Sequence, residues 1–110
     1  MLIGMSGGSD FCAAFLEWFK AGRPVHDFPE SQKHDDYACA LVIEGGRVFT
    51  YDRTPYPVEM LEPICAIGSG REVALGAMAV GATASDAVAA ACRWMECCGN
   101  GIDTMTLETE

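Results

Sequence analysis

The sequence has few basic residues and lacks any long apolar run. Only 7 Lys and Arg stand against 16 Asp and Glu, for a net charge of −9, which excludes a nucleic-acid surface built from clustered positive charge. The charge itself is ordinary for a soluble protein. No apolar run approaches the ~20 residues that a membrane span needs, and no charged signal peptide begins the chain. We therefore predict a cytoplasmic protein with no membrane partner.

The cysteines lack the spacing of a metal site. There are six in the chain, but no C-x-x-C pair, and only Cys97 and Cys98 are neighbours. The other four lie in apolar runs, where cysteine behaves as a small hydrophobe, and we expect buried free thiols. His26 and His34 fall in a polar segment and are expected to be solvated. The sequence therefore predicts no metal and no cofactor.

Half of the residues are apolar and no segment is of low complexity, so residues 1–110 are expected to form a single globular domain. Residues 1–5 read as a strand. A helix follows, with Ser9 as its expected N-cap and Gly22 and Pro24 at its end. Apolar residues recur along it at helical spacing and predict a core-facing stripe: Phe11, Ala14, Phe15 and Trp18. Residues 25–36 are polar and predict a surface loop.

The middle of the chain predicts a hairpin. Residues 37–43 form an unbroken apolar run, residues 44–47 (EGGR) a turn, and residues 48–51 the returning strand. Residues 58–61, close to Pro55 and Pro57, suit a short edge strand. Residues 102–107 alternate like a strand at a sheet edge. With the two helices described next, the order is β-α-β-β-β-α-α-β, which indicates a layered α+β domain.

The stretch 65–92 organises the rest of the chain. Residues 64–67 suit a short buried strand that a glycine turn breaks. Ser69 and Glu72 have the spacing of a capping box for a helix of small residues, which we expect to pack on more than one face and to end at Gly81. Thr83 and Asp86 then open a second helix. Its apolar residues predict one buried stripe: Ala87, Val88, Ala91, Cys92 and Met95.

Several of these pieces resemble one family in the same order. LIGMSGGSD at residues 2–10, ahead of an aromatic helix, is similar to the strand-to-helix joint of proteasome β-type subunits and their bacterial proteasome-like relatives. The hairpin at 38–51, AIGSG at 66–70 with its small-residue helices, and CGNGID at 98–103 also resemble that family. The resemblance covers essentially the whole chain. It implies the four-layer αββα sandwich of the N-terminal-nucleophile hydrolases, whose members form rings and, when active, cut peptide bonds.

The resemblance also implies where the catalytic residues belong. Active members begin with a processed threonine whose amine serves as the base for its own hydroxyl, in a segment that would precede Met1 here. Ser6 is expected to be a turn residue rather than a nucleophile. Ser69, between Gly68 and Gly70, matches an accessory serine near the threonine amine, although helix capping alone also explains it. The family's other accessory positions, an aspartate and a hydroxyl residue, fall at Met95 and Cys98.

Three hypotheses follow. The first is a threonine-peptidase-family protein, missing its first hairpin and inactive without its nucleophile, whose full-length form would act on peptides or proteins. The second is a non-catalytic assembly or binding module on the same fold, and the third is an unrelated small α+β domain. Without the first hairpin, the strand at 2–5, placed inside the complete sheet, would become an exposed edge. Such an edge favours a homo-oligomer or makes the chain poorly soluble alone.

Overall fold

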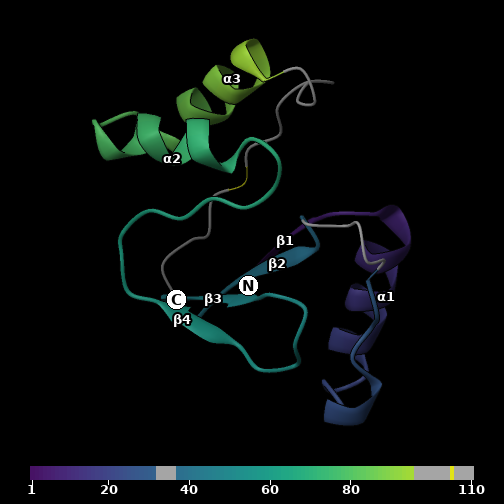
Figure 1. Cartoon of the computed structure of the whole chain (residues 1–110). Coiled ribbons are helices and arrows are strands. Elements are labelled where there is room, and N and C mark those ends of the chain that lie inside the picture. The colour runs from purple at the N-terminus through teal and green to yellow at the C-terminus, as the bar shows by residue number, and fades with distance from the viewer. Residues whose placement is uncertain (32–36, 96–104, 106–110) are drawn as a thin grey trace.

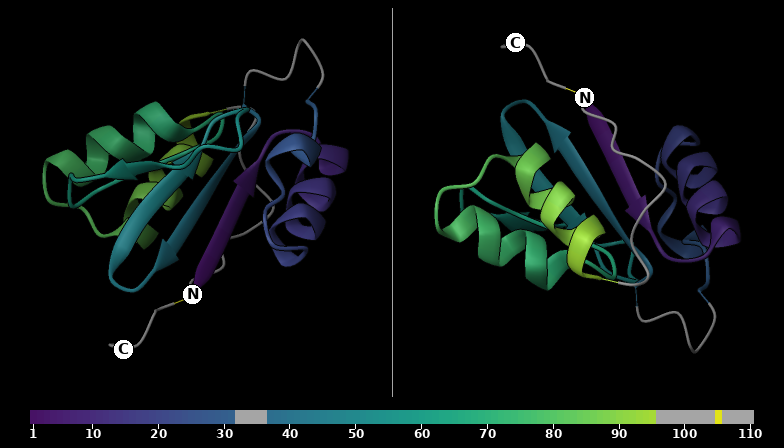
Figure 2. Two further views of the ribbon diagram at one scale, coloured as in Figure 1. Left: turned by 90° about the horizontal axis from the view of Figure 1, so that it is seen from below. Right: turned by 90° about the horizontal axis from the view of Figure 1, so that it is seen from above.

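The computed structural model describes residues 1–31, 37–95 and 105. They form a small α+β domain with one four-stranded antiparallel sheet and three α-helices. In chain order the elements are β1 (Leu2–Ser6), α1 (Ser9–Lys20), the 3₁₀ helix η1 (Val25–Asp27), β2 (Cys39–Glu44), β3 (Arg47–Tyr51), β4 (Val58–Met60), α2 (Arg71–Ala79) and α3 (Ala84–Trp94). Helix α1 lies on one side of the sheet, and the α2–α3 pair lies on the other (Figures 1 and 2).

The sheet is a meander whose strands follow the order β1-β2-β3-β4. The predicted hairpin is confirmed: Glu44 pairs with Arg47, and Gly45 and Gly46 between them have φ values of +59° and +75°. Positive φ at both turn residues is what a two-residue type I′ hairpin requires, and glycine adopts it without strain. Strand β1 pairs with β2, so β1 and β4 are the edges of this sheet.

The face of the sheet toward α1 carries the main core. The predicted aromatic stripe is confirmed except at Ala14, which is exposed. The Phe15 and Tyr51 rings are 5.4 Å apart and meet edge to face. The indole of Trp18 donates a hydrogen bond to the carbonyl oxygen of Pro24 at 2.8 Å. The fully buried residues of this cluster are Phe11, Phe15, Trp18, Ala38, Ala40, Val42 and Tyr51.

Two details of the N-terminal half differ from the prediction. Gly8, not Ser9, is the N-cap of α1, since Ser9 is already the first helical residue. The segment from residue 25 is not simply a surface loop, because Phe28 is half-buried and its ring lies 4.8 Å from that of Trp18. A single aromatic residue in a polar segment has no periodicity, so the sequence gives no signal of its burial. The stop at Gly22 is confirmed, with a φ of +97°.

The opposite face of the sheet is also apolar, but none of its described side chains is fully buried. We call it the open face. Along each strand, side chains alternate between the two faces, so Val42 is 1% exposed toward α1 while Leu41 and Ile43 are only half-buried on the open face. The apolar residues of the open face are Leu2, Leu41, Ile43, Val48, Val58 and Met60.

The ends of α2 and α3 follow from local sequence. Gly81 takes a φ of +104°, and the amide of Ala82 donates to the carbonyl of Ala77 at 3.0 Å. This pattern is a Schellman motif, which confirms that α2 ends at this glycine. The hydroxyl of Thr83 accepts a hydrogen bond from the Asp86 amide at 3.1 Å, so the predicted cap of α3 is confirmed.

The packing of α2 is narrower than we predicted. Only Ala74 is fully buried, while Leu75, Gly76 and Ala79 on the other sides are exposed. Small residues permit a close approach on every side of a helix, but they do not require one. The predicted stripe of α3 is confirmed only in part: Ala87 and Ala91 are buried, Cys92 and Met95 are half-buried, and Val88 is exposed.

The strand predicted at residues 64–67 is wrong, because these residues are neither helix nor strand. The sheet ends at β4, which pairs only with β3, so residues 64–67 do not extend it although they follow β4 in the chain. The strand predicted at 102–107 lies outside the described residues, apart from Met105, which belongs to no element. No helix in the described part of the chain is long and apolar enough to cross a bilayer.

Candidate functional site

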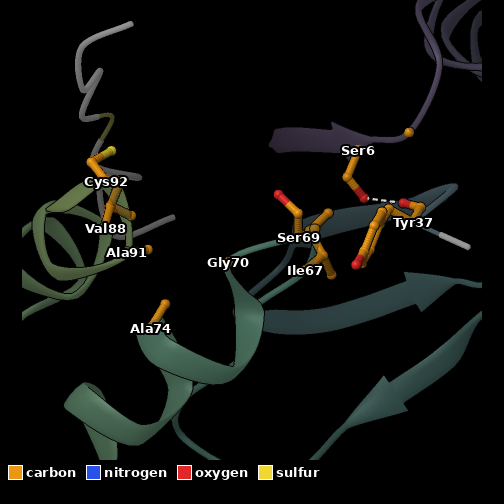
Figure 3. Close-up of a pocket in the computed structure, with 11 residues that line it drawn as sticks. Ser6, Tyr37, Ile67, Ser69, Gly70, Ala74, Val88, Ala91 and Cys92 are labelled. Atoms are coloured by element: carbon orange, nitrogen blue, oxygen red, sulfur yellow. Dashed lines mark hydrogen bonds between the residues drawn. The ribbon is translucent and has the colours of Figure 1, made fainter. Parts of the chain in front are cut away.

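A cavity of about 520 Å³ separates the end of β1 from the α2–α3 pair (Figure 3). Its size falls within the range of small-molecule and cofactor sites. On one side it is lined by Ser6, Gly7 and Tyr37, and next to them by residues 67–70. On the helix side it is lined by Ala74, Val88, Ala91 and Cys92. The cavity therefore brings together the two glycine-containing joints that the sequence singled out.

The glycine turn approaches the end of β1 closely. Gly68 has a φ of +95°, and a Cβ placed on it would lie 3.5 Å from the Cβ of Ser6. The space would admit a methyl group, but the positive φ would strain any L-residue there. The carbonyl of Gly68 accepts from both the amide and the guanidinium of Arg71, at 3.2 and 3.0 Å. These bonds fix the turn against the first residue of α2.

Ser69 lies at the centre of this turn and is half-buried. Its hydroxyl oxygen is directed into the space between Ser6 and α3 (Figure 3). The predicted capping box is wrong, because the N-cap of α2 is Gly70, which has no side chain with which to cap. The predicted N-cap, Ser69, and the observed N-cap, Gly70, differ by one residue. Helix ends are commonly uncertain by about that much. The hydroxyl of Ser69 is thus presented to the cavity rather than to the first turn of α2 as its N-cap.

Ser6 is engaged with the backbone of the sheet. Its hydroxyl donates to the carbonyl oxygen of Tyr37, and the carbonyl of Cys39 lies 3.5 Å away. This hydrogen bond gives Ser6 a structural role at the start of β2. Ser6 is the last residue of β1 rather than the turn residue that we predicted. The ring of Tyr37 lies 5.2 Å from the Arg71 guanidinium, in cation–π geometry.

The sequence did not single out Tyr37, Arg71 or the helix residues of the cavity. Tyr37 reads as the first residue of an apolar strand, and Arg71 as an ordinary charge at a helix start. Arg71 directly follows Gly70 in the sequence, whereas Tyr37 meets the glycine turn only in the folded chain, so no local pattern marks Tyr37. Of the described residues that line the cavity, none has a charged side chain. It suits an apolar group or an extended backbone better than an ion.

Other predicted positions lie away from this site. Among the described residues no group of three or more His, Cys, Asp or Glu could hold a metal ion. His26 is exposed on η1, as expected, and Met95 is the C-cap of α3. His34, Cys97 and Cys98 lie outside the described residues.

Cys39, Cys65 and Cys92 are free thiols, as predicted, but none of the four described cysteines is fully buried. Each is half-buried: Cys12, Cys39, Cys65 and Cys92. Burial is the largest cause that raises the pKa values of Cys39 and Cys65 above their usual range. Raised pKa values leave these thiols protonated and weakly nucleophilic at neutral pH.

No protein-family model, curated protein or solved structure matches this chain.

Proposed function

We propose that this chain is the larger part of a proteasome-like, N-terminal-nucleophile peptidase domain of the αββα type. The order of layers supports this. Helix α1, a sheet, and the α2–α3 pair follow one another, and the open face of the sheet toward α2–α3 is apolar but not fully buried. A second sheet inserted between the open face and the α2–α3 pair would complete four layers. It would bury both the open face and the side of the helix pair that faces it.

The observation that carries the proposal is the direction of Ser69. Its hydroxyl faces the cavity beside the end of β1 (Figure 3), where the resemblance would place an N-terminal threonine. A serine hydroxyl at that position would hydrogen-bond near the threonine amine. It would help to hold the amine as the base for the threonine hydroxyl. Gly68 and Gly70 would hold Ser69 in this position.

We propose further that residues 1–110 alone do not cleave peptides. Residues 1–5 (MLIGM) contain no hydroxyl or thiol, and the hydroxyl of Ser6 is bonded to the Tyr37 carbonyl. A peptidase of this family would draw its threonine from a segment that precedes Met1. Peptide or protein substrates then belong to that longer form.

A non-catalytic assembly or binding module on the same fold is the second candidate. It is favoured by Met95, which occupies the position of an accessory aspartate in active relatives and cannot replace a carboxylate. In this case the cavity would hold a peptide segment without cutting it.

The two candidates differ in the N-terminus of the native protein. A peptidase should show an intact mass that begins at a processed threonine, and a threonine-directed electrophile should label that residue. A Ser69→Ala variant of this form should lose most of its peptide hydrolysis, while the exposed Ala79→Ser variant should keep it. An unprocessed and unlabelled N-terminus, with no hydrolysis, would favour the binding module instead.

We also propose that the 110-residue chain associates with itself through β1. This strand is an edge of the sheet, and its sequence (LIGMS) has no charge and no proline to discourage pairing. Sedimentation should show a dimer or larger species that Gly4→Lys weakens, because Gly4 is exposed in the middle of β1. Gly76→Lys on the exposed side of α2 is the matched control. A monomer with a cooperative melt would contradict this proposal.

A further inference from the structure

Two thiols from distant parts of the sequence line one small cavity. Cys39 is the first residue of β2, and Cys65 lies in the irregular segment between β4 and α2. Both line a cavity of about 250 Å³, together with Asp52 and Arg71. This cavity is next to the candidate site, since Tyr37 and Gly68 line both.

The sheet register links the two thiols through the end of β1. In the sheet register Ser6 is the partner of Cys39, and the Cβ of Ser6 lies 3.5 Å from the Cβ position of Gly68, three residues after Cys65. Burial, then the charge of Asp52 and then that of Cys65 raise the pKa of the Cys39 thiol. The other half-buried thiols, Cys12 on α1 and Cys92 on α3, do not line this cavity.

We propose that Cys39 and Cys65 are a dithiol that closes to a disulfide when it meets a small-molecule disulfide. The thiolate of one cysteine attacks a sulfur of the oxidant and releases one equivalent of its thiolate. The second cysteine then attacks the mixed disulfide at the protein sulfur and releases the other equivalent. The protein loses two protons and two electrons, and the small disulfide is reduced to two thiols.

The bond would fix the joint that leads to the candidate site. Residues 64–67 belong to no helix or strand, so a shift of Cys65 toward Cys39 breaks no ladder of hydrogen bonds. Once formed, the disulfide would tie this segment to the start of β2, three residues ahead of Gly68. The position of the 68–70 turn relative to Ser6 and Tyr37 would then depend on the redox state. This inference does not rest on the proposed peptidase function.

The test is oxidation of the folded 110-residue chain by oxidised glutathione at pH 8. The intact mass should fall by two hydrogens, and digestion without reductant should yield the peptide that joins residue 39 to residue 65. The melting temperature should rise by roughly 5–10 °C, because the cross-link restricts the unfolded chain. A reductant should reverse both changes.

Matched variants separate this pair from the other thiols. Cys39→Ser and Cys65→Ser should each abolish the cross-linked peptide and the rise in melting temperature, whereas Cys12→Ser and Cys92→Ser should retain both. The cross-linked peptide obtained from the unsubstituted chain tests the proposal even if a variant folds poorly. A chain that remains reduced, that stops at mixed disulfides with glutathione, or that joins other cysteines would overturn the proposal.

Discussion

The two faces of the sheet carry similar apolar residues, yet they bury them to different extents. Toward α1, Val42 and Tyr51 are 1% and 2% exposed, whereas none of the described residues of the open face is fully buried. The difference lies in the helices. Helix α1 presents large aromatic rings that fill the space above the sheet, and the α2–α3 pair buries only alanines. Burial of a strand residue is therefore decided by what packs on it.

The largest expected effect is the loss of an α1 ring. Phe15→Ala should lower the free energy of unfolding by about 3–5 kcal/mol, because it leaves a cavity among closely packed rings. Leu75→Ala on α2, where the side chain is 43% exposed, should cost less than about 1 kcal/mol. Urea unfolding followed by tryptophan fluorescence measures both. Equal losses would mean that α2 contributes as much to the core as α1.

The next effect compares one residue type on the two faces. Val42→Ala, toward α1, should destabilise by about 2 kcal/mol. Val48→Ala, on the open face, should cost less than about 1 kcal/mol, since the side chain is only half-buried. If urea midpoints show that Val48→Ala costs as much as Val42→Ala, the open face is covered in solution.

A smaller effect concerns the α2–α3 side alone. Thr83→Ala removes the side-chain acceptor for the Asp86 amide and should cost about 1 kcal/mol. Thr83→Ser keeps an acceptor and serves as the control. Circular dichroism during thermal unfolding measures the change, and near-equal melting temperatures for the two variants would show that this cap contributes nothing.

The smallest effect is a dependence of stability on alkaline pH. The pKa values of Cys39 and Cys65 are raised in the folded state, mainly by burial, from an ordinary value of 9.0. Their contribution to stability is complete below pH 9.0 and is lost as the pH rises through the folded-state pKa values. The reason is that the thiols of the unfolded chain ionise at a lower pH than those of the folded chain. Urea midpoints between pH 8 and 11 should fall less in a Cys39→Ala, Cys65→Ala double variant. An unchanged slope would contradict this.

Local signals predicted much of the fold. The hairpin turn at Gly45 and Gly46, the end of α2 at Gly81 and the cap at Thr83 each depend on a few adjacent residues, and each was confirmed. The aromatic stripe of α1 was also readable, because helical spacing is regular over several turns. These features require no knowledge of the rest of the chain.

Two errors are local, because the N-caps of α1 and α2 each lie one residue away from the predicted Ser9 and Ser69. The other errors concern interactions between distant segments. Phe28 joins the aromatic core from a polar segment, and residues 64–67 form no strand although the edge of β4 is unpaired in the sheet. At the candidate site, the glycine turn and Ser69 could be singled out from sequence. The approach of Gly68 to Ser6 could not, because it depends on how β1 is placed in the sheet.

The pairing of β1 with β2 has a consequence for the order of folding. Strands β2 and β3 are joined by two glycines, so their hairpin can form within about 1–10 μs, whereas β1 reaches β2 only across α1 and the segment that follows it. Closing that longer loop costs conformational entropy before the contacts between β1 and β2 can offset the cost. We therefore expect the hairpin to be the template on which β1 and α1 dock last. Gly45→Ala should slow refolding in stopped-flow experiments, while Ile3→Val should mainly speed unfolding.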